Sequence, residues 1–459
     1  MHESSINPED DNFYKRVIAR MAIGEEDGYL CDATYESAFL GHLFRLVTGW
    51  TVWKGKLGAV SGVKGVSFDN YCIEGDAGAA PELLGNEQSN TSIRYRDDLC
   101  LKLYRKIEAG VSPEVEMSRA LSERTLFRQL PDYLGTLDYD QGRNSRYSIG
   151  ILQGYVRNEG DAWQMALGHV QRYYEEVLSR VQCGIEPPPL HALSGDPVAI
   201  PPVMQELIGG TWLGMVEKLA ERTAEMHIAL ASITDLPEFA PEPFTTLYQR
   251  SIYQAMCEQV KRAMILLKEV RDTMSGERHD LAVHLISNQK RILQQFDPIR
   301  TEKIDTLKVR IHGDYHLGQV LCTGNDFVII DFEGEPARHL SERKIKRSAF
   351  RDVAGMMRSF DYAAFNVLLQ DNPVIRPEDA VRLEPWAERW SYYVGQHFVD
   401  AYFSAAKGHQ IVPEDAGQRE HLLRGYLMNK AVYELNYELN NRPLWASIPM
   451  RGILKLIEL

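Results

Sequence analysis

The spacing of apolar positions predicts helices along most of the second half of the chain. Apolar residues recur three and four positions apart, which places them on one face of a helix. Two of these segments begin with a proline suited to a first helical position, Pro113 after Ser112 and Pro385 after Glu384. The expected helices are 35–50, 112–123, 158–181, 210–232, 247–274, 284–296, 384–403 and 419–440.

Patterns typical of strands concentrate earlier in the chain. "IRYRDDLCLKLYRKI" predicts two strands around the turn at Asp97 and Asp98, and Tyr147–Val156 predicts a buried strand. The proline-rich stretch 184–203 predicts a surface loop without regular structure. Strands early and helices late indicate an α+β fold, with a sheet-bearing lobe followed by a helical lobe.

Composition narrows the class of protein. With 459 residues and a formal net charge of −13, the chain is long enough for two or three subdomains and lacks the basic balance that favours nucleic acid or anionic membranes. The six cysteines include no CxxC pair, so neither a zinc site nor a disulfide framework is expected. The acidic N-terminus does not fit a signal peptide, and no apolar run reaches membrane-span length. We expect a cytoplasmic protein.

One later segment brings chemically useful side chains together. In "HGDYHLGQVLCTGNDFVIIDF" two apolar strands flank the turn "TGND", which predicts a hairpin pairing Val320 with about Ile329. Asp314, Gln319 and Asp331 then meet at one end of the hairpin. Mg²⁺ prefers such oxygen ligands together with phosphate oxygens, and a second carboxylate can deprotonate a hydroxyl group. The alternative is that these acids only cap a turn.

These residues resemble those of a known family. His312, Asp314, Gln319 and Asp331-Phe332 are similar to the kinase pattern H-x-D-x-x-x-x-N followed by D-F, with glutamine in place of asparagine. "HGDYH" resembles the aminoglycoside-phosphotransferase branch of that fold. Together with "IDFEGEPARHLSERK", "FRDVAGMMRSFDYAA" and "NYELNNRPLWASIP", it resembles the maltokinases, free-standing or joined to trehalose synthase. The "WFGGK"-like string with which maltokinases often begin is absent.

The resemblance implies a bilobal protein-kinase-like fold. An N-terminal cap would span 1–85, the rest of the N-lobe with its antiparallel sheet 86–155, and a mainly helical C-lobe 156–459. Asp314 would be the catalytic base, and Asp331 and Gln319 would hold Mg²⁺. Lys102 would bind the ATP phosphates, with Glu116 preferred over Glu114 as its ion-pair partner. Lys102 as an ordinary edge residue is the alternative.

The resemblance also places the nucleotide and the acceptor. "NEQSNTS" stands where a glycine-rich phosphate loop would be, so Ser89, Asn90, Thr91 and Ser92 would donate to phosphate, unless the stretch is a plain polar turn. Adenine would meet Gln153, Tyr155 and Val156. By spacing, one helical face carries residues 430, 433, 434 and 437. The sugar would contact this face through Lys430, Tyr433, Glu434 and Tyr437, with Arg351, Asp361 and Tyr362 as further candidates. The alternative is that the face is a solvated or salt-bridged surface stripe.

The resemblance implies ATP- and Mg²⁺-dependent phosphorylation of maltose at its anomeric hydroxyl, which would feed α-glucan and glycogen synthesis. It also implies an association with trehalose synthase. Two alternatives remain. One is phosphorylation of another hydroxylated small molecule, such as an aminoglycoside. The other is a nucleotide-binding pseudokinase that acts as a scaffold or as a regulator of a trehalose synthase. The presence of Lys102, Asp314 and Asp331 together counts against this alternative.

Overall fold

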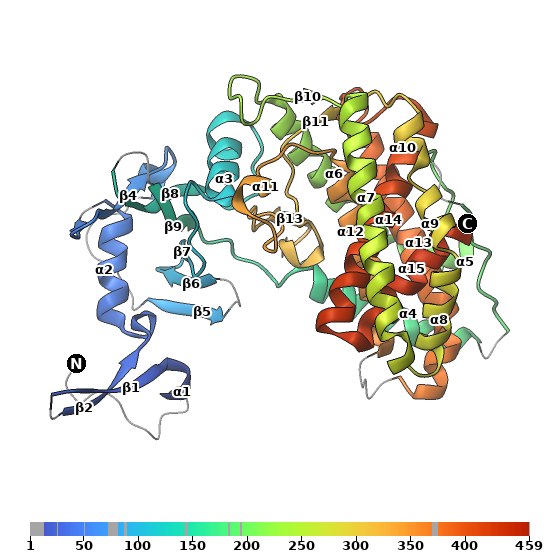
Figure 1. Ribbon diagram of the computed structural model, residues 1–459, viewed down its shortest axis with the longest axis horizontal. Coiled ribbons are helices and arrows are strands. Elements are labelled where there is room, and N and C mark those ends of the chain that lie inside the picture. Colours follow the sequence, from blue (N-terminus) through green and yellow to red (C-terminus); the bar gives the residue numbers. More distant parts are fainter. Residues whose placement is uncertain are drawn as a thin grey trace. The chain divides into compact units, whose positions relative to one another are not determined.

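The computed structural model (Figure 1) describes residues 13–24, 26–49, 51–71, 81–86, 90–142, 146–181, 184–192, 195–369 and 375–458. The chain forms two compact units. The first comprises residues 1–123 and 131–156, and the second comprises 124–130 and 157–459. Among the described residues, no helix combines the length and apolar character that crossing a membrane requires.

The first unit is built on a seven-stranded antiparallel sheet with the order β3-β4-β8-β9-β7-β6-β5. Helix α2 (Ser37–Val47) contributes Leu43 and Phe44 to a core shared with Ile93, Leu101 and Leu152 of the sheet. The predicted cap, 1–85, supplies three strands of this sheet. The strands are β3 (Val52–Lys54), β4 (Ala59–Lys64), β5 (Glu82–Asn86), β6 (Asn90–Tyr95), β7 (Leu99–Tyr104), β8 (Tyr133–Asp140) and β9 (Arg146–Gly154).

Outside the sheet, this unit contains a separate hairpin and three helices. The hairpin pairs β1 (Val17–Ile23) with β2 (Glu26–Cys31). The helices are α1 (Phe13–Arg16), α2 (Ser37–Val47) and α3 (Pro113–Arg124). The predicted turn between β6 and β7 is confirmed, with Arg96 in the left-handed region at φ 56°.

The second unit is mainly helical. Its long helices α6, α7, α12, α13 and α14 pack against one another in a bundle (Figure 1). Large aromatic side chains, among them Trp386, Trp390 and Tyr393, are fully buried between them. The helices are α4 (Ala162–Val181), α5 (Pro202–Ile208), α6 (Gly210–Ser232), α7 (Thr246–Val270), α8 (Glu277–Ser287), α9 (Gln289–Gln294), α10 (Asp297–Thr301), α11 (Leu340–Arg343), α12 (Phe350–Leu369), α13 (Pro377–Ala405), α14 (Ala416–Asn441) and α15 (Ser447–Glu458).

The described residues of the second unit also form two short strand pairs. One joins β10 (Glu242–Pro243) to β11 (Leu307–Lys308). The other is the predicted hairpin, β12 (Val320–Thr323) and β13 (Asp326–Ile329), in which Val320 pairs with Ile329 as expected.

Two predicted helices differ from the structure in where they start. The segment expected at 284–296 is divided between α8, which begins at Glu277, and α9, which begins at Gln289. We expected Pro385 at the first turn of a helix, but α13 begins at Pro377 and Pro385 lies inside it. The first-turn position belongs to Pro377, and packing of the apolar face of α13 against α6 and α12 offsets the loss of a backbone donor at Pro385.

Candidate active site

The loop before β12 is held by one buried carboxylate. Asp352, on α12, accepts hydrogen bonds from the backbone N–H groups of His312 at 2.7 Å and Gly313 at 2.9 Å. His227 on α6 lies 3.2 Å from the same carboxylate and 2.9 Å from the hydroxyl of Tyr402. Burial alone would raise the pKa of Asp352, but the hydrogen bond and charge of His227, the charge of His312 and the hydrogen bond from Gly313 together hold the pKa below its usual value. The two residues before Asp314 are thereby fixed.

Further bonds join this loop to the end of the hairpin. His312 Nε2 lies 2.8 Å from the carbonyl oxygen of Ile330, and the backbone N–H of Ile330 donates to the carbonyl oxygen of Gln319 at 3.0 Å. Asp331 follows directly, with φ of 61°. Such a conformation in a non-glycine residue costs energy and is typical of functional sites.

The negative charges of Asp314 and Asp331 both affect the pKa of His316. Burial lowers the pKa of the His316 imidazole, while the negative charges of Asp314 and Asp331 oppose that shift. The convergence of Asp314 and Asp331 stays a prediction, and the geometry consistent with it is the pair of hydrogen bonds that join His312 and Gln319 to Ile330.

The residues around Asp331 suit a hard cation. Gln319 Oε1 is buried and has no hydrogen-bond partner among the described residues. A buried amide oxygen without a partner is costly unless a ligand satisfies it. The structure also adds a residue that the sequence reasoning missed, because Glu333 and Asp331 have carboxylate oxygens within 4.8 Å of one another. The string Asp331-Phe332-Glu333 carried that signal.

Asp314 opens onto a polar pocket of about 440 Å³, a volume that includes solvent at its mouth. Three predicted acceptor residues, Arg351, Lys430 and Tyr433, line it. Tyr433 donates to Glu335 at 2.6 Å, and burial followed by the charge of Glu335 raises the pKa of the Tyr433 hydroxyl. The lining consists of Gln259, Gly313, Asp314, Tyr315, Glu335, Arg338, Arg351, Asp352, Gly355, Tyr426, Asn429, Lys430 and Tyr433.

Sequence reasoning missed Glu335, Arg338, Gln259 and Asn429 in this pocket. They come from α7, from the loop between β13 and α11 and from α14, and the Glu335–Tyr433 contact spans 98 residues. No local pattern could have paired them.

Four other predicted acceptor residues lie elsewhere. Glu434 is buried and paired with Arg358 at 2.8 Å. Asp361 also pairs with Arg358, in a different pocket. Tyr362 donates to Glu438 at 3.1 Å, and Tyr437 is 47% exposed beside Arg442. The expected common face therefore divides, because residues 430 and 433 turn toward the catalytic loop while 434 turns into the helical core.

In the first unit, the predicted strand lysine has an acidic partner. Lys102, on β7 and 5% exposed, lies 3.3 Å from Glu114, which is 1% exposed. Tyr104 donates to the other oxygen of Glu114 at 2.9 Å. The preference for Glu116 is corrected, since the ion pair is formed by Glu114 in the first turn of α3.

The phosphate-loop prediction is also corrected in part. Asn90, Thr91 and Ser92 are buried residues of strand β6 rather than of a loop, and Ser92 pairs in register with Lys102. Thr91 accepts a bond from Arg105 at 3.1 Å. Ser89 lies outside the described residues.

The predicted adenine residues lie at the end of β9. Gln153 pairs in register with Cys100 of β7. Just beyond the strand, the N–H of Tyr155 donates to Asp98 at 2.8 Å, and Val156 follows it as the last residue of the first unit. Their role in binding adenine stays a prediction.

The chain is similar in sequence to glucosamine kinases. No known family profile matches the chain. It is 25% identical over 395 residues to a glucosamine kinase of Streptacidiphilus jiangxiensis, covering 84% of this chain and 76% of that protein. It is 22% identical over 374 residues to a glucosamine kinase of Mycolicibacterium smegmatis (strain ATCC 700084 / mc(2)155), covering 81% and 78%.

Solved structures establish the fold. A glucosamine kinase in complex with glucosamine, ADP and inorganic phosphate superposes with a TM-score of 0.62 at 19% identity, over 91% of this chain and 98% of that one. A second crystal form of glucosamine kinase gives 0.59 at 18% identity, over 92% and 99%. The expected α+β kinase-like fold is confirmed.

Proposed function

We propose that this protein is an ATP-dependent sugar kinase. The observation that carries the proposal is the placement of Asp314, on a loop anchored by Asp352, at the edge of a polar pocket lined by Lys430 and Tyr433. Sugars need donors and acceptors for their hydroxyl groups, which this lining offers. The names of the relatives, glucosamine kinases, support the same class of activity.

In the proposed reaction Asp314 accepts the proton of the acceptor hydroxyl. The acceptor oxygen forms a bond to the γ-phosphorus of ATP, and the bond from that phosphorus to the β,γ-bridging oxygen breaks to release ADP. Asp331 and Gln319, with Glu333 beside them, would hold Mg²⁺, which neutralises phosphate charge when bound. Lys102, oriented by Glu114, would hold phosphate oxygens.

We propose an amino sugar such as glucosamine as the acceptor. The relatives carry that name, and the pocket offers the carboxylates of Asp314 and Glu335 to an ammonium group. Arg338, Arg351 and Asn429 remain for the hydroxyl oxygens. Maltose is the second candidate. It rests on the four maltokinase-like strings, and with it go the proposed feed into glycogen synthesis and the association with trehalose synthase.

The test is an ADP-release assay with Mg²⁺ and glucosamine, N-acetylglucosamine, glucose, maltose and kanamycin. We expect the highest kcat/KM with glucosamine and a large loss with N-acetylglucosamine, which lacks the ammonium group. Glu335→Gln should raise the KM for glucosamine more than that for glucose, because it removes a negative charge and keeps the shape.

Each other outcome assigns a different function. Turnover of maltose but not glucosamine would establish the second candidate. Turnover of kanamycin alone would make the protein an aminoglycoside phosphotransferase. Silence with every acceptor, in protein that still binds ATP, would favour the pseudokinase scaffold.

A further inference from the structure

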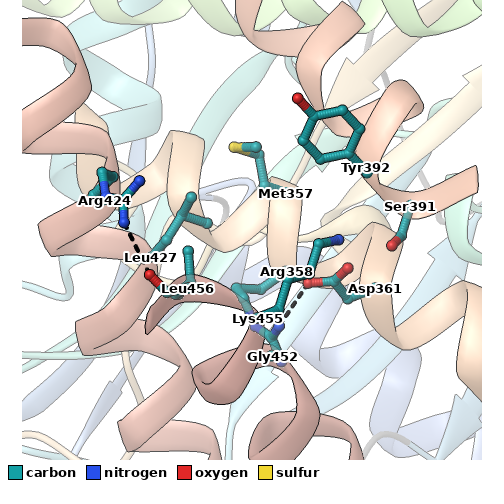
Figure 2. A pocket seen from close by; sticks show the side chains of 10 residues that line it. All are labelled: Met357, Arg358, Asp361, Ser391, Tyr392, Arg424, Leu427, Gly452, Lys455 and Leu456. Carbon is teal, nitrogen blue, oxygen red and sulfur yellow. Dashed lines mark hydrogen bonds and ion pairs between the residues drawn. The ribbon is translucent and has the colours of Figure 1, made fainter. Parts of the chain in front are cut away.

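A second pocket lies among helices α12, α13, α14 and α15, and the catalytic residues do not line it (Figure 2). Its volume is about 540 Å³, again including solvent at its mouth. Figure 2 shows Arg358, Asp361 and Lys455 close together beside Gly452, with Arg424 on the opposite side. The lining consists of Met357, Arg358, Asp361, Ser391, Tyr392, Arg424, Leu427, Gly452, Lys455 and Leu456.

Cationic side chains outnumber acidic ones in this lining. Arg358, Arg424 and Lys455 face a single carboxylate, that of Asp361. Arg358 is 2% exposed, and its Nη2 has no hydrogen-bond partner among the described residues. Its Nη1 and Nε are used by Asp361 at 2.5 Å and Glu434 at 2.8 Å.

Lys455 is the least satisfied of the three cations. Within the described part of the chain its ammonium has no hydrogen bond or ion pair, and it lies 5.4 Å from the ring centroid of Tyr392. The side chain of Lys455 is half-buried, and this burial lowers its pKa, while the charges of Asp361 and Glu388 raise it. Arg424 uses Nη2 for the carbonyl oxygen of Leu456 at 2.9 Å. An anion would satisfy charges that the protein leaves without full compensation.

The rest of the lining indicates what carries the anionic group. Met357, Leu427, Leu456 and the ring of Tyr392 give the pocket an apolar wall. A bare inorganic ion gains nothing from such a wall, whereas a small carbon skeleton buries apolar surface against it. The chemistry therefore fits a small organic phosphate better than free phosphate.

Helices α12 and α14 line both this pocket and the catalytic pocket, and an ion pair links the two helices. Arg358 contacts Glu434, and Glu434 lies one helical turn from Lys430 and next to Tyr433, both of which line the pocket of Asp314. An anion that binds the unpartnered Nη2 of Arg358 would share the positive charge of the guanidinium group with Glu434 and so weaken their ion pair. Glu434 is buried, so a weaker pair would displace that turn of α14 rather than leave the carboxylate unpaired.

We propose that this second pocket binds a small organic phosphate and that its occupation weakens acceptor binding at the catalytic pocket. The binding half of the proposal does not depend on the proposed sugar-kinase activity. The regulatory half depends on that activity, because it is measured as a change in the KM for the sugar.

Binding is tested by calorimetric titration of the full-length protein with glucose 6-phosphate and, separately, inorganic phosphate. We expect glucose 6-phosphate to bind more tightly than inorganic phosphate. Lys455→Met should weaken it by at least about tenfold, since each factor of ten is about 1.4 kcal/mol. Lys455→Arg, which keeps the charge, should bind nearly as wild type. The exposed Lys290→Met on α9 is the matched control and should leave binding unchanged.

Lys430→Met distinguishes the two pockets, because Lys430 lines the catalytic pocket and does not line the second pocket. Binding of glucose 6-phosphate should survive in this variant. Loss of binding there would place the anion in the catalytic pocket and overturn the proposal. So would equal binding by wild type and a folded Lys455→Met, or no binding by wild type up to about 10 mM, which covers millimolar affinities.

Regulation is tested by steady-state kinetics with saturating glucose 6-phosphate. The KM for the acceptor should rise by about fivefold or more, the lower range of allosteric coupling, with kcat little changed. Lys455→Met should be insensitive to the anion. An unchanged KM in wild type that binds the anion would refute the coupling through Arg358 and Glu434.

Discussion

Replacement of Asp352 perturbs the catalytic loop without touching a substrate. Its carboxylate is 1% exposed and accepts from the N–H groups of His312 and Gly313 and from His227. Alanine would leave these buried donors unpaired, at a cost of about 3–5 kcal/mol in the free energy of unfolding, as for other broken buried charge networks. Asparagine keeps one acceptor oxygen and turns an amide N–H₂ toward a donor, which should cost about 1–3 kcal/mol.

The same change should lower the rate, because the loop carries Asp314 two residues after His312. A displacement of about 1 Å at a catalytic group costs about 10²-fold in rate. We therefore expect Asp352→Asn to lower kcat by about that factor with little effect on the KM for ATP. Urea denaturation and steady-state kinetics measure both effects, and exposed Asp272→Asn is the control. An Asp352→Ala protein within about 1 kcal/mol of wild type, well below the cost given above, and with wild-type kcat, would refute the reasoning.

Three further variants test separate features. Gly355→Ala should lower the free energy of unfolding by about 1–3 kcal/mol, because the added Cβ would lie 2.5 Å from the carbonyl oxygen of Tyr315. The control Gly168→Ala on α4, where the Cβ would meet open space, should stabilise by up to about 1 kcal/mol. Equal effects of the two variants in denaturation would count against this packing. Gln319→Leu should raise the Mg²⁺ concentration needed for half-maximal turnover more than Gln319→Glu does, and an unchanged requirement would remove Gln319 from the metal site. Hydrogen bonds from Lys308 and Lys346 lower the pKa of Glu242 from 4.5 to about 2, so the stabilising effect of the ionised carboxylate is present above pH 4.5 and is lost as the pH falls toward 2. Glu242→Gln should therefore flatten that part of a plot of stability against pH. Identical plots for the variant and wild type would contradict the assignment.

The sequence predicted best what depends on neighbours along the chain. The turn "TGND" and its apolar flanks gave the register of Val320 and Ile329, and with it the position of Asp331. Helix α6 runs from Gly210 to Ser232 as predicted, because its apolar periodicity and its glycine at the start are local signals. The strand position of Lys102 followed in the same way from the turn before it.

The parts that failed depend on packing between distant segments. Glu114 rather than Glu116 pairs with Lys102, because the direction in which α3 leaves the sheet decides which side of its first turn faces β7. Lys430 and Glu434 share a helical face by spacing, yet Arg358 of α12 draws Glu434 into the core. Strand pairing across the sheet likewise put Asn90 and Thr91 in β6, where a polar sequence alone suggested a loop.

The most direct test of the central claim is a single-turnover measurement of γ-phosphoryl transfer from ATP to glucosamine by wild type and Asp314→Asn. We predict transfer by wild type and a rate lower by about 10²–10⁴-fold in the variant, because removal of a general base costs that much, with ATP binding retained. A variant that transfers phosphate as fast as wild type would contradict the assignment of Asp314 as the base in this pocket.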